Sequence, residues 1–306
     1  MAKIEVNKLY TLTGHNDCIY ALAEGSDPRF FYTGSGDGMV VEWDLDLPKN
    51  GKLIARLTNS VYALRADLAR NWLFIGHNFE GIHVVDLNDN KEIWSLKLTD
   101  QAIFDIKIVD NYAYVGAADG VLTIVDIKKR AIKKHIKLSS KSIRSLAVAT
   151  KKKHLAVGLS DNTIKILDFA NEFQPVANIT GHSNSVFALS YSPDEQILAS
   201  GARDAKLKFW DSSNYTLSES IVAHLYAINY LSFNRNGDLL ATCSMDKSIK
   251  VWDSVNRKLL KVIDKARNAG HGTSINKVVW STYNGNVIAV SDDRTISIWQ
   301  IQVNNS

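Results

Sequence analysis

The sequence predicts an all-β protein built from repeats of one four-stranded unit. The clearest copy of its central hairpin runs from Ala199 to Asp211, where an apolar run leads into a turn with Asp204 and alternation then resumes up to Trp210-Asp211. This pattern is typical of a β-hairpin. The same hairpin recurs at residues 32–44 and 241–253. A hairpin that returns along the chain indicates a repeat architecture.

The spacing of the closing pair supports this prediction. We call the first member of each pair the anchor, and the anchors are Trp43, Val85, Val125, Leu167, Trp210, Trp252 and Trp299. The steps between successive anchors are 42, 40, 42, 43, 42 and 47 residues. Units of roughly 40–45 residues are the size of one four-stranded propeller blade. We therefore expect a seven-bladed β-propeller with four antiparallel strands per blade.

Two further markers keep the same register. An Asp stands six positions before most anchors: Asp37, Asp119, Asp161, Asp204, Asp246 and Asp293. The second blade departs from this rule, because position 79 is Phe79. A small residue followed by His stands 28 positions before four of the anchors, and these histidines are His15, His182, His224 and His271.

With these markers in register, the chain from Leu12 to Ile301 resembles the WD-repeat β-propeller family. The resemblance implies that the strands of each blade run outward from a central channel, in blade five near 186–191, 197–201, 206–210 and 216–222. It also implies that residues 4–12 supply the outer strand of the last blade, which closes the ring and removes open sheet edges. We expect residues 1–306 to form a single propeller domain.

The family resemblance also assigns a structural role to recurring polar residues. In the family, His, a hydroxyl, Asp and Trp form a hydrogen-bonded network within one blade. The matching residues are His15, Thr33, Asp37 and Trp43; His182, Ser200, Asp204 and Trp210; His224, Thr242, Asp246 and Trp252; and His271, Asp293 and Trp299. The last blade has Ala289 at the hydroxyl position. Blades two to four lack the His and the Trp, and we expect packing to replace the network there.

The alternative is that one such set is a hydroxyl, His and carboxylate catalytic triad. Three copies, each with its own Trp, favour the structural network, and we do not expect an enzyme. We expect no cofactor and no metal: His77 and His83 flank one turn, but no Cys or third His stands nearby, and a zinc site needs three or four protein ligands. The sequence also has no glycine-rich phosphate loop.

Composition bounds the class of protein. The hydrophobic share of 45% and the charged share of 22% are typical of a soluble globular protein. Cys18 and Cys243 stand far apart, which indicates a reducing compartment without disulfides. The N-terminus has no signal-peptide pattern, and no apolar run is long enough for a membrane helix. We therefore expect a cytoplasmic protein without a membrane segment, monomeric by itself.

The register also selects residues that face the mouth of the central channel in this family. They are Tyr20, Tyr62, Phe104, Arg144, Phe187, Asn229 and Asn276, and beside the turn Asp positions Asn78, Arg203 and Met245. One interpretation is a plug of aromatic rings that pack on one another. The other is a site for a protein or peptide partner, because aromatic and Arg clusters are typical of interface hot spots. The predicted function is a protein–protein interaction scaffold, with Phe79 either a contact residue or a space filler.

The opposite face is expected to be basic. Lys128, Lys129 and Arg130 fall in one turn, the run 151–153 of three lysines falls in a turn of the next blade, and Lys133, Lys134 and Lys137 lie between them. A solvated edge that deters sheet pairing explains such charges. The alternative is a patch for nucleic acid or another polyanion, although no aromatic residue is interleaved with these charges.

Overall fold

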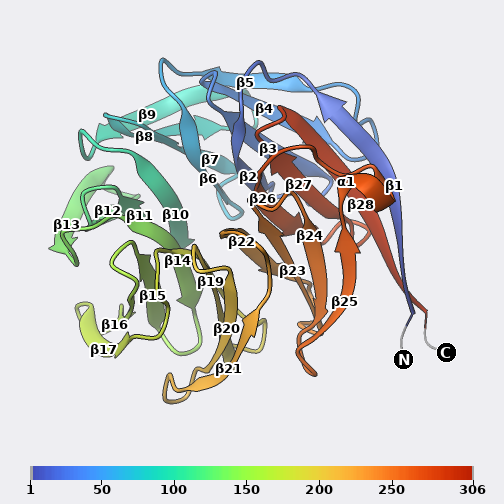
Figure 1. Cartoon of the computed structure of the whole chain (residues 1–306). Coiled ribbons are helices and arrows are strands. Elements are labelled where there is room, and N and C mark those ends of the chain that lie inside the picture. Colours follow the sequence, from blue (N-terminus) through green and yellow to red (C-terminus); the bar gives the residue numbers. More distant parts are fainter. Residues whose placement is uncertain (1–2, 305–306) are drawn as a thin grey trace.

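The structure is a computed structural model that describes residues 3–304, and these residues form 28 β-strands and one short helix. The strands are grouped in seven four-stranded antiparallel sheets that surround a central axis as the blades of a propeller (Figure 1). The innermost strands of neighbouring blades contact one another all the way round the axis. The predicted fold class, a seven-bladed propeller with four antiparallel strands per blade, is confirmed.

We number the blades in chain order and give the strands of each from the innermost outward. Blade one contains β2 (Ile19–Glu24), β3 (Phe30–Ser35), β4 (Met39–Asp44) and β5 (Lys52–Arg56). Blade two contains β6 (Val61–Asp67), β7 (Trp72–His77), β8 (Gly81–Asp86) and β9 (Lys91–Lys97). Blade three contains β10 (Ile103–Val109), β11 (Tyr112–Ala117), β12 (Val121–Asp126) and β13 (Ala131–Lys137).

The remaining blades follow the same order. Blade four contains β14 (Ile143–Ala149), β15 (His154–Leu159), β16 (Ile164–Asp168) and β17 (Gln174–Ile179). Blade five contains β18 (Val186–Tyr191), β19 (Ile197–Ala202), β20 (Lys206–Asp211) and β21 (Leu217–Val222). Blade six contains β22 (Ile228–Phe233), β23 (Leu239–Ser244), β24 (Ile249–Asp253) and β25 (Lys258–Ile263). Blade seven contains β26 (Ile275–Trp280), β27 (Val287–Ser291), β28 (Thr295–Asn304) and β1 (Lys3–Thr13).

The core lies between neighbouring blades, and glycines bring the blades close together. At Gly34, in β3, an added Cβ would lie 2.5 Å from the Cγ1 of Val61 in the next blade. At Gly116, in β11, it would lie 2.5 Å from the Cγ2 of Ile143. No real side chain fits at that distance, so the glycine lets the next blade's inner strand pack directly against the sheet. This packing positions the inner strands of blades two and four, and the inner strands carry the candidate site.

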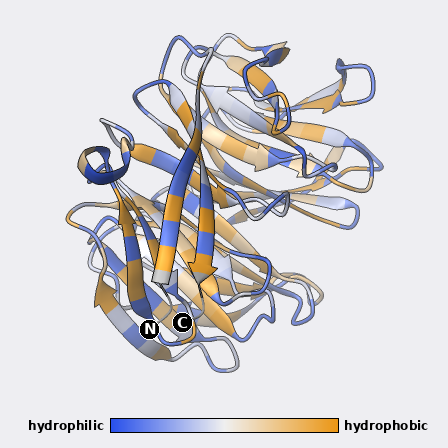
Figure 2. Ribbon diagram, turned by 90° about the vertical axis from the view of Figure 1, so that its right-hand side faces the viewer, coloured by the Kyte–Doolittle hydropathy of each residue, from blue (hydrophilic) through white to orange (hydrophobic). Residues whose placement is uncertain are grey.

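The closure predicted for residues 4–12 is confirmed. β1 pairs with β28 along its whole length, from Lys3 opposite Asn304 to Thr13 opposite Thr295. Ile4 is buried in one core cluster with Trp280 and Trp299. Figure 2 shows hydrophobic and hydrophilic residues alternating along the strands beside the two termini, as expected for strands with one buried face.

The long step before the last anchor contains a short helix, α1 (Lys265–Asn268), where the spacing predicts only a longer loop. The carboxylate of Asp264 caps it by accepting from the backbone N–H of Arg267 at 2.8 Å. A carboxylate is a favoured N-cap because it satisfies a free backbone donor. Within residues 3–304, no helix has the length and apolar content needed to cross a membrane.

Candidate functional site

The residues predicted to face the channel share one backbone feature. In every blade, the pairing of the innermost strand with its neighbour shifts at a single residue, which marks a β-bulge. These residues are Tyr20, Tyr62, Phe104, Arg144, Phe187, Asn229 and Asn276. A bulge leaves one residue out of the ladder and redirects its side chain. All seven are half-buried and line one cavity of about 490 Å³, which we call the mouth cavity.

One side of the mouth cavity is a continuous row of rings. The ring centroids of Tyr20 and Tyr62 are 4.7 Å apart, and those of Tyr62 and Phe104 are 5.8 Å apart. These separations and the tilted geometries are those of favourable aromatic pairs. The rings therefore support one another while each keeps part of its surface exposed to the cavity.

Arg144 continues this row between two phenylalanines. Its guanidinium carbon lies 3.9 Å from the ring centroid of Phe104 and 4.7 Å from that of Phe187, so that the cation contacts both rings. Its Nε is buried and has no hydrogen-bond partner in the described part of the chain. Burial lowers the pKa of Arg144 to about 10, because the charged form loses hydration. The site thus presents a desolvated positive charge beside aromatic faces.

The other side of the mouth cavity is polar and held in place. The Nδ2 of Asn229 donates to the backbone oxygen of Ile275 at 2.8 Å. The Nδ2 of Asn276 donates to the backbone oxygen of Ile19 at 2.9 Å and to Oδ1 of Asp292 at 2.7 Å. The bonds to Ile275 and Ile19 cross between blades, and together these bonds fix the orientations of the two amides. The cavity therefore has one aromatic, cationic side and one amide side.

The residues predicted beside the turn Asp positions do not all line the mouth cavity. Asn78 lines the mouth cavity, is 5% exposed, and has an Oδ1 without a hydrogen-bond partner in the described chain. Phe79 also lines the cavity and is 55% exposed, which excludes its role as a space filler. Arg203 and Met245 are exposed but do not line the cavity. Their turns, like that of Asn78, follow the second strand of the blade, so they lie on the same end of the propeller.

Two apolar residues near Met245 were not predicted from the sequence. Leu225 is 83% exposed and Tyr226 is 62% exposed, and both lie in the loop between β21 and β22. The backbone N–H of Met245 donates to the oxygen of Ala227 in this loop at 3.0 Å. In the sequence, the signal for these two residues was that an apolar pair directly follows His224, where the repeat register places an exposed loop.

The opposite end of the channel holds a second cavity, of about 680 Å³, with buried charges that the sequence analysis missed. The Nζ of Lys107 lies 3.0 Å from Oδ1 of Asp105, and the backbone N–H of Leu146 donates to the other oxygen of this carboxylate at 2.8 Å. Burial raises the pKa of Asp105, but the positive charges of Lys107 and Lys277 and the hydrogen bonds from Leu146 and Lys107 together outweigh it, so the pKa is lowered. The pair therefore stays ionised, and the hydrogen bond from Leu146 joins blades three and four.

The structure brings together the predicted polar networks in blades one, five and six. In blade five, the Nε1 of Trp210 donates to Oγ of Ser200 at 2.8 Å, and this hydroxyl lies 2.8 Å from Nε2 of His182. The Nδ1 of His182 lies 3.0 Å from Oδ2 of Asp204. The same bonds join His15, Thr33, Asp37 and Trp43, and His224, Thr242, Asp246 and Trp252.

These networks have no access to a substrate. Thr33, Ser200 and Thr242 are completely buried, and each hydroxyl already accepts a bond from an indole. A triad nucleophile must instead reach the reacting carbon of its substrate. The geometry therefore favours the structural interpretation of these residues over the catalytic one. A satisfied buried network rigidifies its blade.

Blade seven corrects one prediction. Ala289 occupies the usual hydroxyl position, but Ser297 on the adjacent strand supplies the hydroxyl instead. Its Oγ accepts from Nε1 of Trp299 at 2.8 Å and lies 2.8 Å from Nε2 of His271, whose Nδ1 lies 3.0 Å from Asp293. Ala289 and Ser297 are directly paired across the two strands. A hydroxyl on either strand therefore reaches the same point.

Replacement of Ser297 by alanine is expected to cost about 1–3 kcal/mol of unfolding free energy, because it leaves two buried nitrogens unpaired. Urea denaturation measures this loss. Ser220→Ala, at an exposed position on β21, is the control and should change little. The double variant Ser297→Ala/Ala289→Ser should recover part of the loss, and an unaltered stability of Ser297→Ala would contradict this assignment.

Packing alone does not replace the network in blades three and four, which is a second correction. Thr99 donates to Oδ2 of Asp119 at 3.0 Å, and Ser139 donates to Oδ2 of Asp161 at 2.6 Å. Each hydroxyl lies in the loop that carries His in blades one, five, six and seven. In these two blades Thr or Ser takes the place of His and keeps the hydrogen bond between the loop and the turn Asp, although no Trp takes part.

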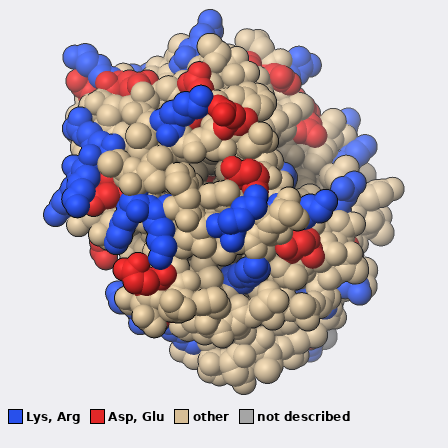
Figure 3. Space-filling model, turned by 90° about the vertical axis from the view of Figure 1, so that its left-hand side faces the viewer, with Lys and Arg blue, Asp and Glu red and all other residues tan. Residues whose placement is uncertain are grey.

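Acidic groups lie among the positive charges of the predicted basic face. Lys128, Lys129 and Arg130 are exposed in the turn between β12 and β13. In the next blade, the carboxylate of Glu195 accepts from the backbone N–H groups of 150–152, so an acidic group occupies the donors of that turn. Figure 3, viewed from the side of β13 in Figure 1, shows Asp and Glu groups among the Lys and Arg side chains.

Two lysines of this face lie near aromatic rings, which the sequence analysis did not anticipate. The Nζ of Lys133 is 4.4 Å from the ring centroid of Tyr112, and the Nζ of Lys153 is 6.0 Å from that of Phe169. Lys134 pairs with Glu172 of the next blade at 3.4 Å. The charges thus make contacts within the propeller, in keeping with a solvated edge.

Comparison with family models identifies the repeats. The model described as WD domain, G-beta repeat matches residues 6–44, 173–211, 215–253 and 260–300, together just over half of the chain. A model described as LVIVD repeat matches residues 103–139, in blade three. The four WD segments are those that contain the complete polar networks, whereas blade three lacks the His and the Trp.

The chain is also similar to parts of known proteins. The chain is 26% identical over 228 residues to protein lethal(2)denticleless of Drosophila melanogaster, covering 67% of this chain and 28% of that protein. It is 34% identical over 102 residues to anaphase-promoting complex subunit cdh1 of Dictyostelium discoideum, covering 32% of this chain and 13% of that protein. The chain thus spans less than a third of the length of either relative.

Among solved structures, the WD40 β-propeller domain of Doa1 superposes with a TM-score of 0.86 at 19% identity and covers 97% of both chains. At this identity the likeness concerns the fold. The family model, the sheet order and the recurring anchors together show that the chain belongs to the WD domain, G-beta repeat family.

Proposed function

We propose that residues 1–306 act as one propeller domain that binds a segment of a partner protein at the mouth cavity. Proteins of this family are typically non-catalytic scaffolds for protein interactions. One of the relatives is named as a subunit of a complex, the anaphase-promoting complex subunit cdh1. The family therefore supports the class of function, and the particular site is argued from this chain's own residues.

The observation that carries the proposal is the position of Arg144 between Phe104 and Phe187, with a buried Nε that has no partner in the described chain. A desolvated guanidinium favours a carboxylate, with which it forms strong charge-assisted hydrogen bonds. The rings beside it favour an apolar or aromatic side chain. The preferred ligand is thus a segment that carries an acidic side chain or its own C-terminal carboxylate next to an apolar residue.

The other side of the cavity suits such a segment. The amides of Asn229 and Asn276 are fixed by bonds to backbone oxygens, and Asn78 presents an oxygen without a partner in the described chain. Amide groups on one wall can pair with the backbone of an extended peptide, while the rings on the other wall hold its side chains.

The two free cysteines, Cys18 and Cys243, suit a protein of a reducing compartment, and we propose the cytoplasm.

Alanine substitution of the ring residues tests this proposal. Tyr62→Ala and Phe187→Ala are each expected to weaken partner binding by about 2 kcal/mol or more, roughly 30-fold, because buried aromatic anchors dominate interface energies. Partners are first captured from lysate on the tagged wild-type protein and identified by mass spectrometry, and their affinities are then measured on each variant.

The matched control is Tyr10→Ala, which removes a similar ring that is 39% exposed on the outer strand β1. Its partner binding should equal that of the wild type. A partner that binds Tyr62→Ala and Phe187→Ala as tightly as it binds the control would contradict the assignment of the mouth cavity as the recognition site.

A further inference from the structure

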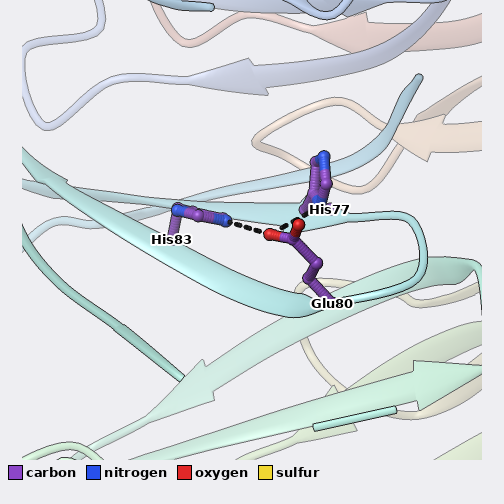
Figure 4. Close-up of side chains that lie close together, drawn as sticks. All are labelled: His77, Glu80 and His83. Atoms are coloured by element: carbon purple, nitrogen blue, oxygen red, sulfur yellow. Dashed lines mark ion pairs between the residues drawn. The ribbon is translucent and has the colours of Figure 1, made fainter. Parts of the chain in front are cut away.

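The hairpin between β7 and β8 of blade two gathers three side chains of a type that binds metal ions. His77 ends β7, Glu80 lies in the turn and His83 lies on β8 (Figure 4). The Oε2 of Glu80 is 3.3 Å from Nδ1 of His77 and 3.4 Å from Nε2 of His83, and one ligand atom of each residue lies within 4.8 Å of the others. We call these three residues the His-Glu-His cluster.

Both histidines are oriented by a partner on the far side of the ring. The Oγ1 of Thr58 lies 3.3 Å from Nε2 of His77, and Oε2 of Glu92 lies 3.0 Å from Nδ1 of His83. Each ring therefore turns its other nitrogen toward Glu80. Metal-binding histidines are typically held in this way, with a hydroxyl or carboxylate on the nitrogen that does not bind the metal.

One of the inward nitrogens has no hydrogen bond. His77 is 1% exposed, and its Nδ1 is buried without a hydrogen-bond partner in the described chain, although it lies within ion-pair distance of Glu80. Buried side-chain nitrogens nearly always have a partner, so an exception calls for an explanation. A ligand at the centre of the cluster would satisfy this atom.

The turn of this hairpin differs from that of the other blades in a way that places Glu80 inside the cluster. Elsewhere the left-handed residue directly follows the turn Asp, as at Ala205 after Asp204. In blade two the left-handed residue is Phe79 itself, at φ 71°, one position earlier in the register. A bulky residue in this conformation is uncommon and costs energy.

We propose that the His-Glu-His cluster binds one divalent transition-metal ion of the zinc class. Two imidazole nitrogens and one carboxylate oxygen are ligands that Zn²⁺ takes at roughly 2.0–2.2 Å. Ligand atoms at the corners of a tetrahedron with such bonds are about 3.4 Å apart, close to the separations of Glu80 from both histidines. Imidazole ligands favour zinc over Mg²⁺ and Ca²⁺, which prefer oxygen.

Three protein ligands leave the fourth position for water or for a group of a bound partner. Asn78 and Phe79 lie between His77 and Glu80 in the chain and line the mouth cavity. The bound metal would hold this edge of the cavity in one conformation. The metal site itself does not depend on the proposed function, because its ligands and its test involve no partner protein.

Titration with ZnCl₂ tests this proposal. The protein of residues 1–306 is freed of metal with chelator, and isothermal titration calorimetry is carried out in metal-free buffer. The wild type is expected to bind one equivalent of Zn²⁺, with no saturable binding of Mg²⁺. Glu80→Gln and His83→Ala should each lower the zinc affinity at least tenfold, and Thr58→Val, which removes the hydroxyl behind His77, should lower it by about tenfold.

The matched control is His135→Ala, which removes an exposed histidine on β13 whose ring contacts Thr123. Its zinc affinity should equal that of the wild type. Circular dichroism in metal-free buffer shows whether Glu80→Gln and His83→Ala fold, and both replace side chains that are partly exposed. Absence of stoichiometric zinc binding by the wild type would overturn the proposal, as would equal affinity in the wild type and both ligand variants.

Discussion

Deletion of residues 1–12 is expected to abolish the cooperative melting of the propeller. The deletion removes nearly all of β1, which forms the outer strand of blade seven beside β28. It also removes the buried side chains of Ile4 and Leu12, which are 7% and 3% exposed, and the burial of two such side chains contributes roughly 3–6 kcal/mol. The lost strand pairing adds to this, whereas the whole stability of a domain is only about 5–15 kcal/mol.

Differential scanning calorimetry and light scattering measure this outcome. The deletion variant should show a broad transition or none, with aggregation through the open edge of β28. The control is Leu9→Ser in the chain of residues 1–306, which changes a residue of β1 that is 38% exposed and should melt as the wild type does. A sharp transition of the deletion variant at the wild-type temperature would show that closure by β1 contributes little.

Replacement of Asp204 by alanine is expected to lower the unfolding free energy by about 2–3 kcal/mol. Its carboxylate accepts from Nδ1 of His182 at 3.0 Å and from the backbone N–H groups of Ser183 and Lys206 at 2.9 and 3.1 Å. Burial raises the pKa of Asp204, but these hydrogen bonds outweigh it and lower the pKa to about 2. A carboxyl with a pKa lowered this far contributes roughly 2–3 kcal/mol at neutral pH.

The pH dependence gives this prediction a second check. Because the pKa of Asp204 is lower in the folded state than the roughly 3.9 of an unfolded chain, its contribution is present above about pH 4 and is lost as the pH falls toward 2. Urea denaturation should therefore show a large difference between wild type and Asp204→Ala at pH 7. The difference should shrink in acid, and a difference that grows as the pH falls would contradict the assignment.

A double-mutant cycle with Trp210→Phe shows whether the blade-five network acts as a unit. Trp210→Phe keeps most of the apolar bulk but removes the donor to Ser200, at an expected cost of roughly 1–3 kcal/mol. The double variant should lose less than the sum of the single losses, because both residues belong to one network. Strict additivity would show that Asp204 and Trp210 are independent.

The spacing of the anchors was sufficient to predict the blades, because each repeat is one hairpin-based unit of nearly constant length. The anchors Val85, Val125 and Leu167 mark their blades as clearly as Trp does, because the strand needs an apolar residue at the anchor position and not an indole. The closing role of residues 4–12 rested on family resemblance, and the pairing of β1 with β28 confirms it.

Features that depend on contacts between strands were harder to predict. Ser297 replaces the hydroxyl missing at Ala289 because the two residues are paired across β27 and β28, a relation that the linear register does not contain. Glu80 joins His77 and His83 only because the backbone turns at Phe79. Arg203 and Met245 share the sequence register of Asn78, but only Asn78 lines the mouth cavity, a difference that the linear register does not contain.

The central claim is that the row of rings and Arg144 at the mouth cavity serves binding and not packing. The most direct measurement is the affinity of Arg144→Ala for a captured partner segment with an acidic or C-terminal carboxylate, set beside the urea stability of the same sample. Recognition predicts an affinity loss of at least tenfold, with the unfolding free energy within about 1 kcal/mol of the wild type. A loss of about 3 kcal/mol or more in stability, with affinity retained after correction for the unfolded fraction, would show instead that Arg144 is part of a plug.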